Sequence, residues 1–450
     1  MKILLIYPNP DQKFDSMKYR LIWSISKKIS NRLSKFSLGS PTGYIIPPLS
    51  LLVVAANTPP GIEIEFIDER IEEINFNSRV DLVGISVMTS AANHSYKIAQ
   101  TFMQKGTPVV LGGIHPSLLP NEAIKYANSV VIGEVEGLWG EILNDCKNKR
   151  IKKFYKNRDI PYLHNLPIPR FDLLKDGVYV TNNIIETSRG CPHKCSFCAS
   201  SKIFGNKYRY RPVMDIINEI KECKMEHQHI VFISDNIFGN KRFAESLFSK
   251  LIPLNITWQG GSTISIANYP EILKLASRSG CKSLLIGFES ITASNLSKID
   301  KKQIQNPGDY PSLIKRIHRE NIGITGNFIV GLEDDQKSVF KDITEFVYKN
   351  NIECPQVSIL IPYPGTKIHE FLKKKKRIVS YNWDYYSNIS GNVVYEPKNM
   401  SISELKSGYW KTWKRIYSSR SIFKRLISTR NFLSFYLPYN IVKKMKANII

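Results

Sequence analysis

The sequence predicts an α/β protein made of two successive βα series and a mainly helical C-terminal extension. A chain of 450 residues is too long for one hydrophobic core, since domains typically hold roughly 100–200 residues. In both halves, short β-branched apolar runs alternate with stretches of helical periodicity, which indicates parallel sheets covered on both faces. A basic, proline-containing segment separates the two series. We therefore expect a doubly wound domain over 1–150, a linker over 151–182, six βα units over 183–370 and an extension over 371–450.

The first series consists of five strand-like runs with helical patterns between them. Each run is short and almost entirely apolar, as expected for a strand that is buried on both faces of a sheet. Ala91–Gln104 is an example of the intervening helices. The predicted strands are Lys2–Tyr7, Glu63–Ile67, Leu82–Val87, Val109–Leu111 and Val130–Ile132.

An insert separates the first two strands. Apolar residues recur at helical spacing from Leu21 to Phe36, and basic residues take the other faces. This pattern predicts an amphipathic helix, which we expect to pack on the domain. The alternative is a basic surface helix.

The second series has six strand-like runs. Helical patterns such as Pro212–Cys223, Pro270–Ser279 and Pro311–Glu320 separate them. Six units are fewer than the eight of a closed barrel. The predicted strands are Ile184–Thr187, Ile230–Ser234, Thr257–Gln259, Ser283–Gly287, Asn327–Val330 and Gln356–Leu360.

The charge of the chain bears on its partners. Lys and Arg number 63 against 39 Asp and Glu, a formal net charge of +24. Such an excess suits nucleic acid, an anionic membrane surface or a phosphorylated ligand, and the alternative is a coat of solvated lysines. No secretory signal or apolar stretch of ~18 residues is visible. The seven cysteines are an odd number with three clustered, which argues against a disulfide framework, so we expect a protein of the reducing cytoplasm.

The strongest motif reads Arg189-Gly-Cys191-Pro-His-Lys-Cys195-Ser-Phe-Cys198 and follows a predicted strand. Three clustered thiolates indicate an iron–sulfur cluster, which usually takes four cysteines, so that three would leave one iron open to a substrate or cofactor. Zinc is the alternative, since it also binds thiolates and His193 lies inside the loop, but a second ligand pair of the usual spacing is missing. Three inert core thiols in one such loop are the least favoured interpretation.

The C-x3-C-x2-C spacing after the first strand of a βα series resembles the motif of the radical S-adenosylmethionine (SAM) enzymes. The resemblance implies that Cys191, Cys195 and Cys198 hold a 4Fe–4S cluster whose open iron binds the amino and carboxylate groups of SAM. Electron transfer from a reductant such as flavodoxin or ferredoxin would cleave the sulfonium and yield a 5′-deoxyadenosyl radical. The family fold, a partial (β/α)6 barrel, agrees with the six βα units.

The same resemblance places SAM contacts at the ends of several strands. Phe197 would lie near the adenine, Asp235 and Asn236 near the methionine end, and Glu289 at the ribose, where a carboxylate accepts hydrogen bonds from two hydroxyls. Capping of the following helix is the alternative role for such polar residues. The fifth strand, where many members carry Gly and Glu at the outer positions, supplies two further expected contacts, Ile329 and Gly331.

The N-terminal domain resembles a cobalamin-binding domain. Gly112-Gly113 follows a predicted strand, where glycine lets a ligand approach the carboxyl end of the sheet, although a nucleotide fits this motif as well. Such domains often carry a histidine ligand of cobalt after the first strand, but residues 7–12 contain none; His94 and His115 are expected to be surface or loop residues. The expected cobalamin contacts are Ser86, Thr89, Ser90, Gly112, Gly113, Gly133 and Glu134.

Both halves together resemble the cobalamin-dependent radical SAM branch that includes hopanoid methylases, phosphonate methylases and the anaerobic porphyrin ring cyclase. The resemblance implies methylation of an unactivated carbon of a small-molecule or lipid substrate, with methylcobalamin as methyl donor. One alternative is a cobalamin-dependent radical cyclase or rearrangement enzyme without methyl transfer. A different class is a zinc-stabilised basic RNA-binding protein.

The C-terminal extension combines basic and aromatic residues. Residues 401–450 hold eleven Lys and Arg and one acidic residue, Glu404, interleaved with Tyr, Trp and Phe. Such segments are typical of contact with anionic lipid. We expect peripheral membrane contact that weakens when Lys443, Lys444 and Lys446 are changed to Glu. The alternatives are aromatic residues that close the barrel beneath solvated lysines, and nucleic acid as an unlikely partner.

Overall fold

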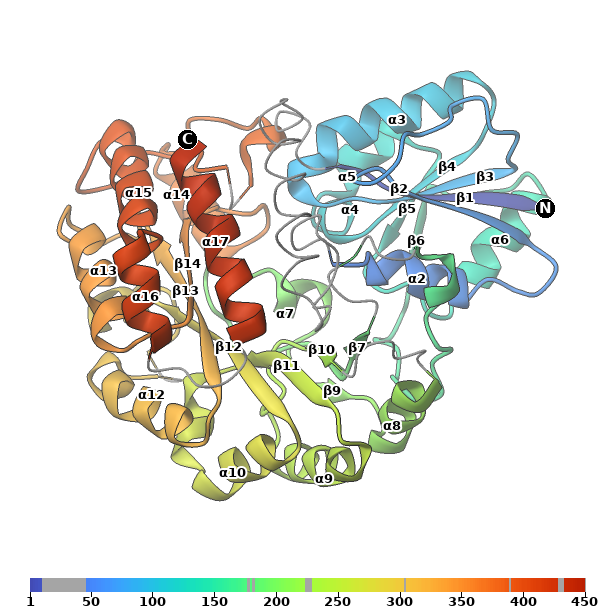
Figure 1. Ribbon diagram of the computed structural model, residues 1–450. Coiled ribbons are helices and arrows are strands. Elements are labelled where there is room, and N and C mark those ends of the chain that lie inside the picture. Colours follow the sequence, from blue (N-terminus) through green and yellow to red (C-terminus); the bar gives the residue numbers. More distant parts are fainter. Residues whose placement is uncertain are drawn as a thin grey trace.

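The computed structural model describes residues 1–9, 46–175, 179, 183–222, 229–302, 305–387, 390–427 and 433–449. Two α/β domains lie side by side, the first in blue and cyan and the second in green to red (Figure 1). The helix expected over 21–36 lies outside the described residues, as do residues 10–12 and Cys223.

The N-terminal domain contains a six-stranded parallel sheet with the order β2-β1-β3-β4-β5-β6. All five strands predicted for this domain are confirmed, with ends that differ by no more than one residue. The strands are β1 (Lys2–Tyr7), β2 (Glu63–Asp68), β3 (Leu82–Ser86), β4 (Val109–Gly112), β5 (Ser129–Ile132) and β6 (Phe154–Lys156).

Helices cover both faces of this sheet, as the apolar runs predict. Successive side chains of a strand point to opposite faces. Leu4 and Ile6 therefore join one buried cluster, which contains residues of α3, while Ile3 and Leu5 join another, which contains residues of α2 and α6. Figure 1 shows α3 on one side of the sheet and α2 and α6 on the other. The helices are α2 (Leu49–Ala56), α3 (Ala92–Gln104), α4 (Ile114–Leu118), α5 (Pro120–Ala123) and α6 (Trp139–Lys147).

Strand β6 lies beyond the expected domain boundary at residue 150. It pairs in parallel with β5 at the edge of the sheet. Only Tyr155 of its three residues is buried. An edge strand with charged residues carries little apolar signal, so that the sheet extends into the segment expected to be a linker.

The second domain contains a six-stranded parallel sheet with the order β14-β13-β12-β11-β10-β7. Because β7 and β14 are its two edges, the described strands form an open, partial barrel. All six strands predicted for this domain are confirmed. They are β7 (Ile184–Glu186), β10 (His229–Ile233), β11 (Thr257–Ser262), β12 (Cys281–Glu289), β13 (Gly323–Val330) and β14 (Cys354–Ile359).

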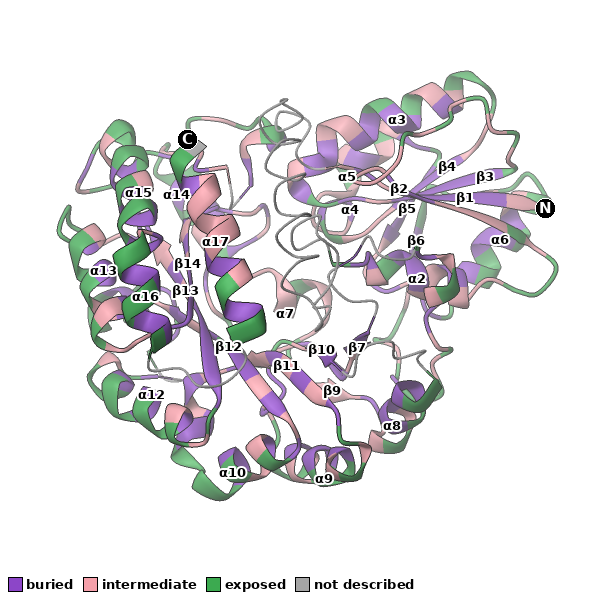
Figure 2. Ribbon diagram, viewed as in Figure 1, coloured by how far each residue is buried: buried purple, intermediate pink, exposed green. Residues whose placement is uncertain are grey.

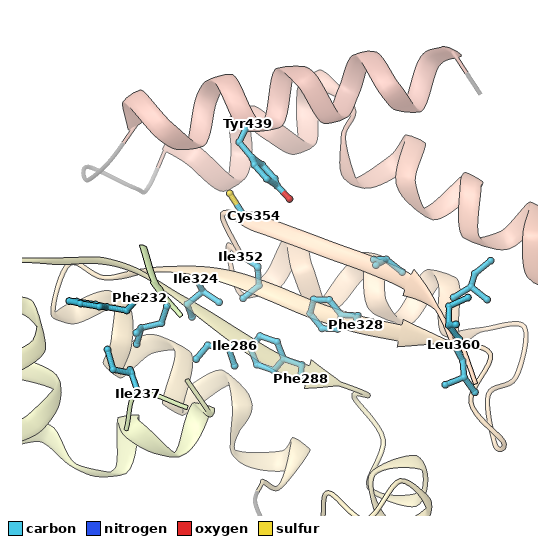
Figure 3. Packing of buried hydrophobic residues seen from close by; sticks show 14 of the residues in the cluster. Phe232, Ile237, Ile286, Phe288, Ile324, Phe328, Ile352, Cys354, Leu360 and Tyr439 are labelled. Carbon is cyan, nitrogen blue, oxygen red and sulfur yellow. The ribbon is translucent and has the colours of Figure 1, made fainter. Parts of the chain in front are cut away.

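Amphipathic helices surround this sheet and bury one face each (Figure 2). The core holds a stack of aromatic rings, in which Phe288 of β12 and Phe328 of β13 lie parallel with ring centroids 5.2 Å apart (Figure 3). Such offset stacks add to the stabilisation from burial. The outer helices are α8 (Val213–Glu222), α9 (Lys241–Leu251), α10 (Pro270–Arg278), α11 (Ala293–Lys298), α12 (Tyr310–Arg319) and α13 (Val339–Lys349).

The C-terminal extension is helical, as expected, and packs against β14 and α13. Its helices are α14 (Lys367–Lys374), α15 (Ile402–Ile416), α16 (Ser419–Ile427) and α17 (Leu433–Ile449). No helix within the described ranges is long and apolar enough to span a bilayer.

Most aromatic residues of the extension belong to the core, which corrects their expected contact with lipid. Tyr409, Trp413, Tyr417 and Tyr436 are all buried, and Trp413 Nε1 donates to the carbonyl of Val357 in β14 at 3.1 Å. The Lys443 ammonium lies over the rings of Trp413 and Tyr439, 5.5 and 5.2 Å from their centroids. Burial lowers the pKa of Lys443 to about 8. These side chains therefore hold α15 and α17 together.

Candidate active site

The three motif cysteines lie on a loop that an antiparallel pair of strands encloses. Strand β8 (Ser188–Arg189) pairs with β9 (Arg209–Tyr210), and α7 (Ser200–Ile203) lies between them in the sequence. Gly190 begins the loop with φ +83°, and a Cβ there would collide with the carbonyl oxygens of Lys207 and Phe204. Only glycine fits this turn, so the glycine before the first cysteine is a requirement of the local backbone.

The thiols of Cys191, Cys195 and Cys198 are free and half-buried. The backbone N–H of Cys198 donates to the carbonyl of Cys195 at 3.1 Å, which curls the loop. Burial raises the pKa of Cys195 to about 11, and the charges of the other two thiols act in the same direction. The three sulfurs are therefore close enough to influence one another, although no three His, Cys, Asp or Glu side chains in the described part of the chain form a ready-made metal site.

This donor set fits an iron–sulfur cluster. All three donors are sulfur, which iron–sulfur clusters require, and cluster binding would displace the thiol protons. The ring of His193 makes an edge contact with Tyr208 at 6.2 Å, and burial lowers its pKa. Tyr208 also lies beside the first cysteine, with its hydroxyl 3.9 Å from Cys191 Sγ. Sequence reasoning did not identify Tyr208.

Asp235 and Asn236 lie beside this loop, as the sequence predicts for residues after β10. Ser200 Oγ, in α7, donates to Asp235 Oδ1 at 2.9 Å. Asn236 Nδ2 donates to the hydroxyl of Tyr208 at 3.4 Å, and its Oδ1 accepts from the backbone of Phe238 at 3.2 Å. Burial raises the pKa of Asp235. Both residues thus connect the end of β10 to the cysteine loop.

Glu289 ends β12 in a left-handed conformation, with φ +61°. Its carboxylate pairs with Lys301 at 2.8 Å, and Lys301 Nζ also donates to the carbonyl of Gly287 at 2.8 Å. Both side chains are largely buried. Positive φ at a non-glycine residue costs about 1–3 kcal/mol and clusters at functional sites. Lys301 was not identified from the sequence, because it lies in a polar run in which lysine side chains are expected to be exposed to solvent.

Gly331 follows β13 with φ +87°, and a Cβ there would collide with the hydroxyl of Tyr395. That hydroxyl donates to the carbonyl of Gly331 at 2.6 Å. Asp335 Oδ2 accepts from the backbone of Gly331 at 2.8 Å, and burial raises the pKa of Asp335 to about 6. The expected adenine contacts Ile329 and Phe197 are half-buried and pack against the core.

Several buried polar atoms of the barrel strands and the cysteine loop have no hydrogen-bond partner among the described residues. Thr187 follows β7, Ser234 follows β10, Asn327 lies in β13 and Ser196 lies in the cysteine loop. Their side-chain oxygens make no hydrogen bond within the described ranges. Native proteins rarely leave such groups unsatisfied. A ligand with amino, carboxylate and hydroxyl groups, such as SAM, fits these donors and acceptors.

The N-terminal sheet has its topological switch point between β1 and β3, which lie side by side although β2 separates them in the sequence. Ligands of doubly wound sheets bind outside the carboxyl ends of the strands at this point. The Tyr7 hydroxyl, at the end of β1, donates to Met88 Sδ at 2.9 Å. Ser86 ends β3, and its Oγ lies 3.0 Å from Ser50 Oγ.

The expected cobalamin contacts lie at this edge. Thr89 Oγ1 is buried without a partner among the described residues, as expected where a ligand supplies one. Gly113 has φ +96°, and a Cβ there would approach the backbone nitrogen of Val87 within 2.9 Å. Ser117 Oγ donates to the carbonyl of Gly113 at 2.7 Å and accepts from the backbone of Gly133 at 2.9 Å. Two other expected contacts lie close by in the chain. Ser90 follows β3 and is half-buried, and Gly112 of β4 pairs with Ser86 of β3.

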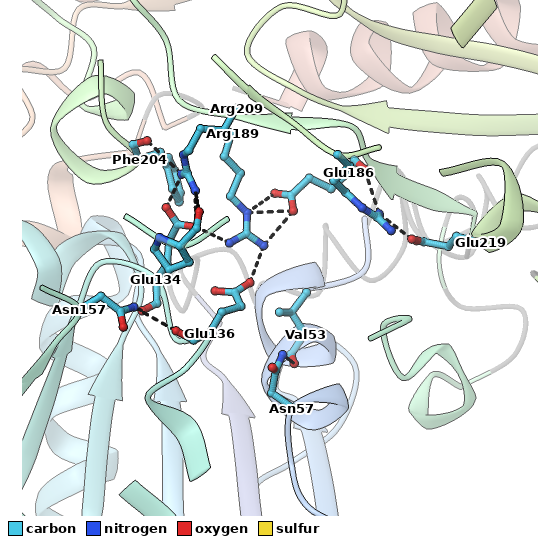
Figure 4. Close-up of polar contacts among 12 residues, drawn as sticks. Val53, Asn57, Glu134, Glu136, Asn157, Glu186, Arg189, Phe204, Arg209 and Glu219 are labelled. Carbon is cyan, nitrogen blue, oxygen red and sulfur yellow. Dashed lines mark hydrogen bonds and ion pairs between the residues drawn. The ribbon is translucent and has the colours of Figure 1, made fainter. Parts of the chain in front are cut away.

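Glu134 has a role that the sequence did not reveal. Its carboxylate pairs with Arg189 at 2.6 Å and with Arg209, both from the second domain (Figure 4). Arg189 Nη2 also pairs with Glu136 at 2.6 Å and Glu186 at 2.8 Å. Burial alone would lower the pKa of Arg189, but the nearby carboxylates of Glu186 and Glu136 raise it. We call Arg189, Arg209, Glu134, Glu136 and Glu186 the interdomain clamp.

The two histidines of the N-terminal domain are structural. His115, expected on the surface or in a loop, is instead fully buried in α4, with Nε2 3.0 Å from the hydroxyl of Tyr96. His94 lies in α3 and pairs with Glu69 at 2.6 Å. The described end of β1, at Tyr7 to Asn9, contains no histidine.

Comparison with known proteins agrees with the two domains. Residues 38–143 match the B12 binding domain family, and residues 185–347 match the radical SAM superfamily. Bacteriochlorophyllide d C-12(1)-methyltransferase of Chlorobaculum tepidum is 29% identical over 406 residues, which cover 87% of this chain and 87% of the relative. Hopanoid C-2 methylase of Rhodopseudomonas palustris is 23% identical over 401 residues, which cover 84% of this chain and 71% of the relative.

Among solved structures, the cobalamin-dependent SAM radical enzyme OxsB with aqua-cobalamin and SAM bound superposes with a TM-score of 0.66 at 14% identity, covering 100% of this chain and 74% of OxsB. The expected fold and the expected cofactors, a 4Fe–4S cluster, SAM and cobalamin, are thereby confirmed. The zinc-stabilised RNA-binding alternative is set aside. The contacts of individual residues with the cofactors stay predictions.

Proposed function

We propose that this chain, a radical SAM enzyme with an N-terminal B12-binding domain, methylates an unactivated carbon of a small-molecule or lipid substrate. The observation that carries the proposal is the interdomain clamp. Arg189 stands two residues before the first cysteine, and its partners Glu134 and Glu136 follow the carboxyl end of β5. The clamp therefore holds the carboxyl end of β5, where we expect cobalamin to bind, against the cysteine loop of the other domain.

The residues of the chain have distinct tasks in this proposal. When bound, the cluster and SAM supply one-electron chemistry, and cobalamin supplies a transferable methyl group. Cys191, Cys195 and Cys198 would hold the cluster. The rigid Glu289–Lys301 pair would present a carboxylate oxygen to the ribose, since only Oε1 is used by Lys301. The unpartnered Thr89 hydroxyl would hydrogen-bond to cobalamin.

The substrates named for two relatives, a bacteriochlorophyllide and a hopanoid, support a lipid-like substrate. A lipid-like substrate is found at membranes, and we propose that the protein contacts an anionic membrane surface peripherally. The net charge of +24 supports this contact. A flavodoxin or ferredoxin is the proposed electron donor.

Methyl-labelled SAM tests the proposed reaction. The full-length chain, reconstituted without oxygen with cluster and cobalamin, is incubated with flavodoxin and with separate lipid and polar extracts. We expect label in a product of the lipid fraction together with 5′-deoxyadenosine. Release of 5′-deoxyadenosine with an altered but unlabelled product would favour cyclisation or rearrangement instead. Cys146→Ala is a matched control for Cys191→Ala, because Cys146 lies in α6 with its thiol directed to the carbonyl of Asp81.

A further inference from the structure

The solvent-facing side of α16 is both apolar and basic. The side chains of Phe423 and Ile427 are 68% and 66% exposed, one helical turn apart. Arg420 and Lys424 are exposed on the adjacent positions of the same helix. Exposed aromatic and aliphatic side chains of this size are costly in water, so that a contiguous group marks an interaction site.

The start of α17 also carries exposed apolar residues. Leu433 and Leu437 are 43% and 40% exposed and also lie one turn apart. Because α17 packs against α16, the two exposed pairs belong to neighbouring helices. We call Phe423, Ile427, Leu433 and Leu437 the apolar tip. Figure 2 shows this lower end of α17 as exposed.

A basic cavity lies next to the tip, between α13, α15 and α16. Its volume is about 360 Å³. Glu345 is its sole acidic lining residue and pairs with Lys341 at 3.7 Å and Lys349 at 3.4 Å. The lining residues, which we call the cationic groove, are Lys341, Thr344, Glu345, Tyr348, Lys349, Arg415 and Lys424.

Two cations of the groove are not neutralised. No carboxylate pairs with Arg415 or Lys424 in the described part of the chain, and Lys424 Nζ lies 5.0 Å from the ring centroid of Tyr348. Lys424 joins the two features, since it lines the groove and is the neighbour of Phe423 in α16. An anion in the groove would therefore sit beside apolar side chains.

The core fixes the orientation of this surface. Arg425, on the opposite face of α16, is fully buried and donates to the carbonyls of Ile352 and Glu353 at 2.9 and 2.7 Å. The exposed face of α16 is consequently held outward. The tip lies near the amino ends of the barrel strands, because Tyr436 in α17 donates to the carbonyl of Lys282 in β12 at 3.0 Å. This is the end opposite to the cofactor residues.

We propose that the apolar tip and the cationic groove dock the protein onto a bilayer that contains anionic phospholipid, with the tip at the acyl boundary and the groove on a lipid phosphate. The inference specifies the surface for the peripheral contact proposed above. Apolar side chains beside unpaired cations complement a lipid surface, in which phosphate and hydrocarbon adjoin. Nucleic acid offers no apolar layer for four aliphatic and aromatic side chains. Docking at this end keeps the protein at the bilayer with the cofactor end turned toward solvent, so that a membrane-derived substrate must leave the bilayer to reach the site.

Vesicle flotation with the full-length chain tests the proposal. Vesicles of phosphatidylcholine alone are compared with vesicles that hold about 30% phosphatidylglycerol. We expect binding to the anionic vesicles at ~0.05 M salt, weakened at ~0.5 M salt, and little binding to the neutral ones. Arg415→Glu with Lys424→Glu should weaken binding by at least about tenfold. Phe423→Ser with Ile427→Ser should weaken it comparably without a change in salt dependence.

Matched controls distinguish this surface from general charge. Lys373 and Lys374 are exposed in α14, and changing both to Glu alters the net charge equally. This control should change binding less than about twofold. The proposal is overturned by equal losses in the control, by absence of binding to anionic vesicles, or by tighter binding of the same residues to RNA than to lipid. Because flotation needs no turnover, a negative result here leaves methyl transfer untouched.

Discussion

Removal of Arg189 should separate the two domains. Arg189 is 8% exposed, and its guanidinium binds Glu134, Glu136 and Glu186, which are 3%, 7% and 17% exposed. In Arg189→Met, the apolar part of the side chain remains, but Glu136 and Glu186 lose their ion-pair partner, and only Glu134 keeps one among the described residues, Arg209. Since Glu134 and Glu136 belong to the other domain, most of the resulting repulsion acts across the interface.

The expected cost follows from the burial of these charges. Removing one partner of a buried ion pair costs about 3–5 kcal/mol, because the remaining charge stays desolvated. A change of 1.36 kcal/mol corresponds to about a tenfold change in an equilibrium constant, so that the undocked fraction should rise by roughly two to four orders of magnitude. Arg189→Met with Glu136→Gln should recover part of this loss, because one unpaired carboxylate is removed.

Limited proteolysis of the apo protein measures this undocking. Cleavage between the domains, over residues 157–183, reports the open fraction when opening is fast relative to cleavage. Thermal unfolding should separate into two transitions in Arg189→Met, one for each domain. Because the cluster is absent in this experiment, disturbance of the neighbouring Cys191 does not affect the readout.

Arg170→Ala is the matched control. Arg170 pairs with Asp172 at 2.7 Å, and the two side chains are 43% and 61% exposed. Such surface pairs contribute about 0–1 kcal/mol, so this variant should behave like the wild type. Proteolysis of Arg189→Met at the wild-type rate, with a single unfolding transition, would show that the clamp does not hold the domains together.

Four further predictions concern the cofactors and the core. The cluster, measured as iron and sulfide content, should be lost in each of the variants Cys191→Ala, Cys195→Ala and Cys198→Ala. Cys281→Ala should retain the cluster, because Cys281 is buried at the start of β12. Full cluster loading of any motif variant contradicts the assignment. Glu289→Gln should weaken SAM binding by about ten- to a hundredfold in equilibrium dialysis, since a charge-assisted hydrogen bond contributes about 1.5–3 kcal/mol, and an unchanged affinity refutes the ribose contact. Electron paramagnetic resonance of Co(II)-cobalamin should be the same on protein with ¹⁴N- and ¹⁵N-labelled histidine; a change in the axial nitrogen splitting would identify a histidine ligand, since the benzimidazole of the cofactor itself carries no label. Lys443→Met should remove a pH dependence: burial lowers the pKa of Lys443 from 10.5 to about 8, so the wild type should lose about 3 kcal/mol of stability as pH falls from about 10.5 to about 8, and a variant with the same dependence in denaturant titrations excludes Lys443 as its source.

The sequence was sufficient for the strands because their apolar character is local. All predicted strands of both sheets are present, since each buries side chains on two faces. β6 was missed, because an edge strand with the single buried residue Tyr155 has no such pattern. Positions where the backbone requires glycine can also be recognised from the sequence alone. Gly190 and Gly113 both have positive φ, and both are the glycines of their motifs.

Tertiary contacts account for what the sequence did not predict. Lys301 and Lys443 stand in Lys-rich runs that read as solvated, yet Glu289 draws the first into the site and two aromatic rings cover the second. The alternation of basic and aromatic residues after residue 400 is compatible with both a lipid-facing and a packed segment. Only the positions of β14 and α13 decide which side chains point inward.

The interdomain clamp suggests why charged groups, rather than apolar ones, connect these domains. A hydrophobic interface of equal area would associate at least as strongly, since buried ion pairs rarely exceed apolar packing in free energy. A planar guanidinium, however, binds carboxylates only in its own plane and at fixed angles, which restricts the rotation of one domain relative to the other. Arg189 directly precedes the glycine that begins the cysteine loop, and Glu134 directly follows Gly133, where an added Cβ would lie 4.0 Å from the carbonyl oxygen of Ile203 in α7. A rotation of either domain would therefore displace the cluster loop relative to the cobalamin edge. The proposed methyl transfer depends on the distance between the two cofactors, and the directional clamp restricts changes in that distance more than a non-directional apolar contact would.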